Sequence, residues 1–260
     1  MKNIDFTVVL GVDQKTIELL KIVYPTWLKC KSSLLKNPFV IFTNGVKANE
    51  VSSILKDVSD ATYVDWPPVG VEYPRDGIEK WDNPQRAKML AGFVHVPAQF
   101  VETPYWLKLD LDVVATGNDN WVDPGWFDGD PAIIAPGWNY TKPATQMLKL
   151  DEWAARHKPK FLDGTPPMDL KPEPGSDLVK HPRICSWCAF FNTEFTRMCS
   201  VEFEKTCGIG QLPVDSQDGA LFYAAKRGGY SIRVVSMKRH GWMVRGTYSG
   251  VKSMARDVLQ

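Results

Sequence analysis

Two carboxylates stand one residue apart in an otherwise apolar stretch of the sequence. The run 107–114, Leu-Lys-Leu-Asp-Leu-Asp-Val-Val, places Asp110 and Asp112 at the end of an expected buried strand. Burying an unpaired carboxylate is costly, and a bound divalent cation would offset that cost. Mg²⁺ and Mn²⁺ prefer carboxylate oxygens and also bridge the oxygens of a diphosphate. The pair therefore predicts a metal site, although an edge strand with Lys108, Asp110 and Asp112 all facing solvent fits the same alternation.

The elements before this pair alternate between strand and helix. Residue spacing predicts three strands and two helices between them, at 6–12, 14–29, 38–43, 48–56 and 61–66. Strands joined by helices of this length form parallel sheets through right-handed crossovers. Such sheets bind ligands at the carboxyl ends of their strands. Asp13 and Asp65 each follow one of these strands, and we expect them to meet a nucleotide there.

The rest of the chain continues the alternation. The expected elements are helices at 84–94, 193–205 and 216–227, a strand with its exit over 104–115, and strands at 184–191 and 230–235. Six prolines within 157–182 predict a long loop. No repeat or linker divides the sequence, so we expect one α/β domain over 1–260, with a mainly parallel central sheet flanked by helices.

Three further motifs accompany the acidic pair. A helix bearing Arg86 and Lys88 precedes the pair. After the pair, an acidic helix start, Asp215-Ser-Gln-Asp218, leads toward a Gly-Tyr turn. The run 240–242 is His-Gly-Trp. In this order the motifs resemble the GT-A fold of nucleotide-sugar-dependent glycosyltransferases. The resemblance spans roughly residues 6–242. It implies a 1–115 part that binds a nucleotide sugar and a 116–260 part that binds the acceptor.

The resemblance also implies the metal ligands. Asp112 would be the principal ligand of Mn²⁺ or Mg²⁺, Asp110 would touch the metal or the donor ribose, and His240 would be a third ligand. The metal would stabilise the charge on the departing diphosphate. His240 also fits an ordinary surface position in a basic run.

Further roles concern the donor and the acceptor. Asp13 and Asp65 would lie near the base and ribose, and Arg86 near the diphosphate. Asp218 would sit beside the acceptor hydroxyl, as general base if the enzyme inverts the anomeric centre. The alternatives are a helix N-cap for Asp215 and Asp218 and a solvated helix face for Arg86.

Ten tryptophans supply flat apolar faces that pack against sugars or stack on bases. Most of them are expected in the core. Trp187 and Trp242 adjoin the segments expected to line the cleft, and we expect them to contact the sugar or the acceptor.

Charge is nearly balanced overall and uneven locally. The net charge is +1, yet residues 226–260 hold eight basic side chains and one acidic one. We expect this basic C-terminal tail to close over a diphosphate or to face a polyanionic acceptor such as modified DNA, with an ordinary solvated surface as the alternative.

No apolar run approaches the length of a membrane span, so we expect a soluble, cytoplasmic protein. Five cysteines with no export signal favour reduced thiols. Cys185 and Cys188 have a spacing found in zinc and redox sites, but on one continuous strand their side chains would point to opposite faces.

Together these features predict a metal-dependent glycosyltransferase that uses a nucleotide-sugar donor, UDP-sugar foremost, and an unidentified cytoplasmic acceptor. Two alternatives stay open. Asp110 and Asp112 also resemble the first motif of haloacid-dehalogenase-like phosphatases, with Asp110 as nucleophile. A module that binds a nucleotide or glycan without turning it over is the other.

Overall fold

The computed structural model describes residues 4–65, 97–143, 178–198, 225 and 230–260. Its helices are α1 (Ile17–Cys30), α2 (Ala48–Ile54), α7 (Tyr248–Leu259) and the 3₁₀ turns η1 (Ser32–Lys36), η2 (Pro124–Phe127) and η4 (Met237–His240). Its strands are β1 (Phe6–Asp13), β2 (Phe39–Asn44), β3 (Ala61–Asp65), β4 (Tyr105–Leu109), β5 (Val113–Ala115), β6 (Ile133–Ala135), β7 (Gly137–Pro143), β8 (Leu178–Ile184), β9 (Cys188–Asn192), β10 (Ile232–Val234) and β11 (Trp242–Val244).

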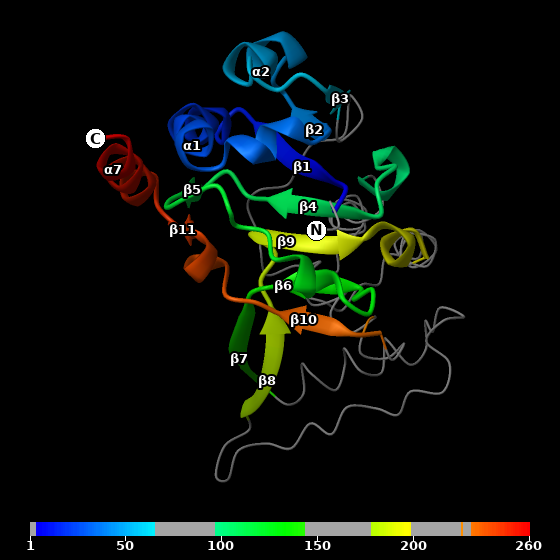
Figure 1. Cartoon of the computed structure of the whole chain (residues 1–260). Helices are drawn as coiled ribbons and strands as arrows, with labels where there is room; N and C mark the ends of the chain where they lie inside the picture. Colours follow the sequence, from blue (N-terminus) through cyan, green and yellow to red (C-terminus); the bar gives the residue numbers. More distant parts are fainter. Residues whose placement is uncertain (1–3, 66–96, 144–177, 199–224, 226–229) are drawn as a thin grey trace.

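A seven-stranded sheet organises the molecule, in the order β10-β6-β9-β4-β1-β2-β3 (Figure 1). Every described pairing in it is parallel except those of β9, which runs antiparallel to both β4 and β6. Strands from before and after residue 115 share this sheet. The expected α/β class with a mainly parallel central sheet is therefore confirmed.

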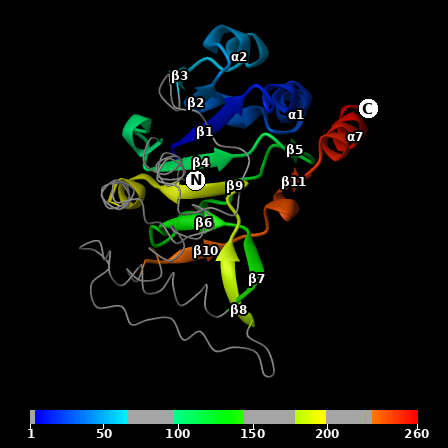
Figure 2. The ribbon, with the colours of Figure 1, turned by 180° about the vertical axis from the view of Figure 1, so that it is seen from behind.

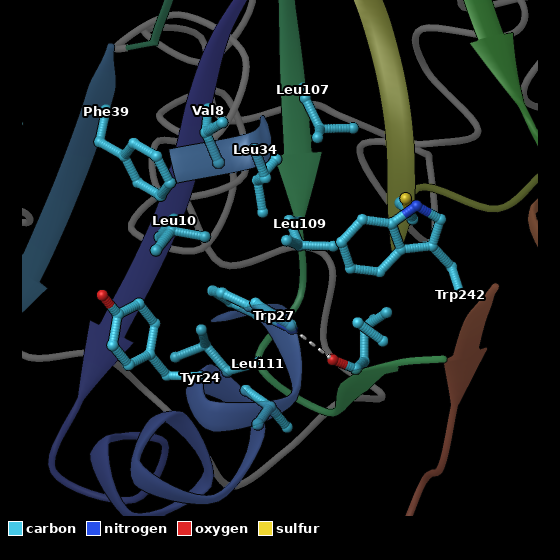
Figure 3. Close-up of a cluster of buried hydrophobic side chains, with 14 of the residues drawn as sticks. Val8, Leu10, Tyr24, Trp27, Leu34, Phe39, Leu107, Leu109, Leu111 and Trp242 are labelled. Atoms are coloured by element: carbon cyan, nitrogen blue, oxygen red, sulfur yellow. Dashed lines mark hydrogen bonds between the residues drawn. The ribbon is translucent and has the colours of Figure 1, made fainter. Parts of the chain in front are cut away.

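The core forms where α1 packs against the sheet. Val8, Leu10 and Leu107 on the strands are fully buried, as is Trp27 on α1 (Figure 3). The Trp27 Nε1 donates a hydrogen bond of 3.0 Å to the carbonyl of Val113, which joins α1 to β5 inside the core. Burying large apolar side chains supplies the main driving force for this packing.

Four boundaries differ from the sequence expectation. The helix expected from residue 14 begins at Ile17, because Asp13 and Thr16 form a hydrogen-bonded turn first. The stretch 104–115, expected as one strand and its exit, holds two strands: β4 ends at Leu109, a turn follows at 110–112, and the exit forms β5. The expected strand 184–191 is likewise broken between β8 and β9. The end of the expected loop 157–182 belongs to β8, which pairs with β7.

The C-terminal segment is not a loose tail. β11 pairs antiparallel with β5, and α7 packs against α1 and β5 (Figures 1 and 2). Lys252 and Arg256 of α7 line a groove of about 390 Å³ with Lys21 and Pro25 of α1. Two of the eight basic side chains of residues 226–260 thus lie at a groove between two helices.

Among the described helices, none has the length and apolar character needed to cross a membrane.

Candidate active site

The turn that carries the acidic pair lies between β4 and β5. Leu109 and Leu111 are 1% and 4% exposed, and burial of these alternate side chains leaves Asp110 and Asp112 partly accessible. The amide of Asp110 donates to the carbonyl of Trp187 at 2.8 Å, and the amide of Arg245 donates to the carbonyl of Asp112 at 3.1 Å. Two segments distant in sequence therefore fix the backbone of both aspartates.

The two carboxylates have different surroundings. Lys108 Nζ donates to Oδ1 of Asp110 and, at 3.2 Å, to the carbonyl of Ser186. Partial burial, followed by the negative charge of Asp110, raises the pKa of Asp112 above its usual range. The site thus holds a carboxylate whose negative charge is disfavoured by its surroundings.

The donor set fits a hard divalent cation. Asp110 and Asp112 offer carboxylate oxygens, which Mg²⁺ and Mn²⁺ prefer. A cation bound by them would offset both the burial and the repulsion from Asp110 that raise the pKa of Asp112. Within the described residues, no three His, Cys, Asp or Glu side chains gather as a metal-binding cluster, so these residues supply no third side-chain ligand.

His240 ends η4, and its ring meets the ring of Trp126 edge-on, with centroids 4.5 Å apart. The structure does not gather His240 with Asp110 and Asp112 into one cluster of ligands.

Asp13 and Asp65 lie at the carboxyl edge of the sheet. Asp13 is in register with Asn44 of β2, and Asp65 with Thr43, so three adjacent strands end together. The Oδ1 of Asp13 accepts from the amides of Lys15 and Thr16, at 2.8 Å each, and so shapes the entry into α1. The Oδ1 of Asp65 accepts from the hydroxyl of Thr43 at 2.8 Å.

No protein-family model matches the sequence, and the search of curated proteins found no match. Solved structures do match. Core-mannan synthase A (CmsA/Ktr4) from Aspergillus fumigatus, in its Mn/GDP form, has a TM-score of 0.59 at 12% identity, covering 88% of this chain and 72% of that one. The mannosyltransferase Ktr4p from S. cerevisiae in complex with GDP gives 0.55 at 9% identity, covering 84% and 66%. A further structure of Ktr4p gives 0.53 at 12% identity, covering 83% and 64%.

This chain has the GT-A-type fold of these glycosyltransferases. Its central sheet and flanking helices match theirs over most of the chain, which confirms the fold that the motif order predicts.

Within this GT-A-type fold the two tryptophans have different surroundings. Trp187 lies in the turn before β9, and its side chain is half-buried. Trp242 is 0% exposed and packs edge-on against Trp121, with ring centroids 5.0 Å apart. A fully buried ring presents no face to a sugar, so the structure corrects the expectation that Trp242 contacts the substrate.

The cysteine pair does not form a metal site in the described structure. Cys188 is fully buried on β9, and burial raises the pKa of its thiol. Cys185 precedes the turn between β8 and β9 and is part-exposed. No disulfide joins Cys185 to Cys188.

Four expected site residues, Arg86, Lys88, Asp215 and Asp218, lie outside the described residues. Lys108, which contacts Asp110 directly, is not among the site residues expected from the sequence. The sequence does indicate this contact, because side chains alternate along a strand and residues 108 and 110 therefore lie on the same side. The backbone contact from Arg245 carries no such signal, since it depends on the pairing of β5 with β11.

Proposed function

We propose that this chain is a metal-dependent glycosyltransferase that moves a sugar from a nucleoside diphosphate sugar to an acceptor hydroxyl. The observation that carries the proposal is the turn of Asp110 and Asp112 at the carboxyl end of β4 within a GT-A-type fold. Core-mannan synthase A in its Mn/GDP form supports both the metal and the diphosphate.

In this proposal Asp110 and Asp112 hold the divalent cation. The bound cation would supply positive charge to the diphosphate as the bond to the sugar breaks. The chain's own part is to hold both carboxylates in place through the backbone hydrogen bonds from Asp110 to Trp187 and from Arg245 to Asp112. Carboxylates that are already held in place need no rearrangement when the nucleotide sugar binds.

The other proposed roles concern binding of the nucleoside and the sugar near the carboxyl edge of the sheet. Asp13 and Asp65 would bind the nucleoside, because they stand where adjacent parallel strands end. Trp187 would contact the sugar from the turn beside Asp110. Arg86 as the diphosphate cation and Asp218 as the general base belong to the same proposal, whereas His240 is left out of it because it does not gather with Asp110 and Asp112.

The direct experiment measures release of nucleoside diphosphate from a panel of UDP-sugars and GDP-sugars. UDP is the nucleotide favoured from the sequence, whereas two of the similar structures named above hold GDP. We expect release with one donor class, dependent on Mn²⁺ and lost with a chelator. Asp112→Ala is expected to lower turnover at least about a hundredfold, because a metal contributes several kcal/mol to stabilising the leaving group.

Asp5→Ala is the matched control, since Asp5 is an exposed aspartate at the amino end of β1, the opposite edge of the sheet. Full activity of Asp112→Ala in chelator would contradict the proposal. Metal-dependent nucleotide binding without any release would favour the binding module, and phosphate release from simple phosphate esters would favour the phosphatase.

A further inference from the structure

Lys108 is a cation built into the acidic site. It lies on β4, between β1 and β9, in register with Val9 and Ala189. Its side chain is only 15% exposed, whereas that of Asp110 is 43% exposed. An enclosed ammonium group requires partners, and the described ones include Oδ1 of Asp110 and the carbonyl of Ser186.

The position of Lys108 sets it in competition with a metal. An ammonium group and a divalent cation both bind the carboxylate oxygens of Asp110, and the two cations repel each other at short range. A metal that binds Asp110 must therefore weaken or displace the contact from Lys108. A displaced ammonium would keep the carbonyl of Ser186 but lose the carboxylate of Asp110.

We propose that Lys108 is an internal counter-cation of the acidic pair, which weakens metal binding to the free protein and couples it to binding of the donor diphosphate. This inference rests on the proposed function. A diphosphate bound at the same site supplies the anionic partner that Lys108 loses to the metal, so the two ligands favour one another. The coupling is reciprocal, because each ligand changes the affinity of the other by the same factor.

Among the described residues, two other basic residues near the turn, Lys31 and Arg245, have different contacts. Lys31 is 1% exposed and donates to the carbonyl of Asn118, with its Nζ 5.8 Å from the centre of the Trp242 ring. Arg245 reaches Asp112 through its backbone amide. Lys108 is the residue whose ammonium contacts a carboxylate of the acidic pair in the described structure.

The test is a calorimetric titration of Mn²⁺ into the protein alone, with saturating GDP, and with saturating UDP. Lys108→Met removes the charge at similar length, and Lys108→Gln also removes it while retaining a donor for Ser186. We expect both variants to bind Mn²⁺ alone about threefold to tenfold more tightly, since partly exposed ion pairs are weak. The gain in Mn²⁺ affinity caused by the nucleotide should shrink by the same factor.

Lys36→Met is the matched control, because it removes one exposed lysine charge from η1. It should leave both affinities unchanged, and thermal unfolding checks that each variant is folded. If only Lys108→Gln folds, its titrations decide the question. Unchanged Mn²⁺ affinity in the folded Lys108 variants, with normal metal and nucleotide binding in the wild type, overturns this inference alone. Absence of Mn²⁺ binding by the wild type with either nucleotide overturns the proposed function as well.

Discussion

Asp112 carries a charge that the folded protein disfavours when no metal is bound. Burial and the neighbouring charge of Asp110 raise its pKa, so the folded state holds the proton more strongly than the unfolded chain does. The charged form therefore costs stability at neutral pH. This cost disappears as the pH falls through the raised pKa of the folded state toward the ordinary value of the unfolded chain.

Asp112→Asn keeps the shape and removes that charge. We expect the metal-free variant to melt at a slightly higher temperature than the wild type at neutral pH, while Mn²⁺ no longer stabilises it. Thermal unfolding with chelator and with Mn²⁺ measures both effects. The same substitution at Asp5, an exposed position, serves as the control. A lower melting temperature in chelator would contradict this account of the site.

Tyr24 shows a second charge effect, away from the site. Burial, with the hydrogen bond of 3.0 Å from its hydroxyl to Asp57, raises the pKa of Tyr24 from 10.0 to about 12. Because its pKa is higher in the folded protein, Tyr24 stays neutral there at a pH at which it ionises in the unfolded chain. The contribution of Tyr24 to the free energy of unfolding is therefore complete below pH 10 and is lost as the pH rises toward 12.

Tyr24→Phe removes this contact between α1 and the segment after α2. We expect the free energy of unfolding to fall by about 1 kcal/mol at neutral pH, the usual net value of such a hydrogen bond. The difference from the wild type should narrow between pH 10 and 12, as Tyr24 ionises in the unfolded wild type. Denaturant unfolding across this range measures it, and a difference that does not change with pH would refute the assignment.

At the scale of elements, Gly241 joins η4 to β11 beside the strand that follows the acidic turn. Its carbonyl accepts from the amide of Thr116 at 2.7 Å, and its φ of +79° is in the left-handed region. A Cβ at this position would lie 2.1 Å from the carbonyl oxygen of Thr116. Only glycine therefore allows this approach of the two backbones.

Gly241→Ala is expected to lower the free energy of unfolding by about 3 kcal/mol or more, from backbone strain and overlap together. Gly117→Ala is the matched control, because its φ is +71° and a Cβ there would meet nothing within 4 Å. This control carries the strain alone, about 1 kcal/mol. Equal losses in the two variants, measured by denaturant unfolding, would show that the close approach to Thr116 is unimportant.

The elements differ in how far the sequence predicts them. β1, β2 and β3 fall within a residue or so of their expected positions, because short apolar runs between turn residues are a clear strand signal. β4 ends at the acidic pair as expected, but β5 was not expected as a separate strand, because the apolar alternation continues through Leu111 into Val113. The hydrogen bond from Asp110 to Trp187 continues the pairing of β4 with β9 by one residue, and β5 is a strand because it pairs with β11, a segment far away in sequence.

At the scale of the whole molecule, the direction and order of the strands lie beyond the sequence pattern. An apolar run of residues predicts a strand but not its direction, and β9 enters the sheet antiparallel between β4 and β6. That arrangement brings Ser186 and Trp187 to the acidic turn, while β11 brings Arg245. The sequence motif therefore predicts that the two aspartates form a site, but the residues that surround them are determined by the order and direction of the strands.

The whole account depends on where a divalent cation binds. The most direct measurement is the anomalous scattering of manganese in crystals grown with Mn²⁺ and a nucleoside diphosphate. The account predicts one strong peak within coordination distance of the carboxylates of Asp110 and Asp112, beside the diphosphate. A nucleotide-bound crystal with manganese at another place, or with none at these carboxylates, would contradict it.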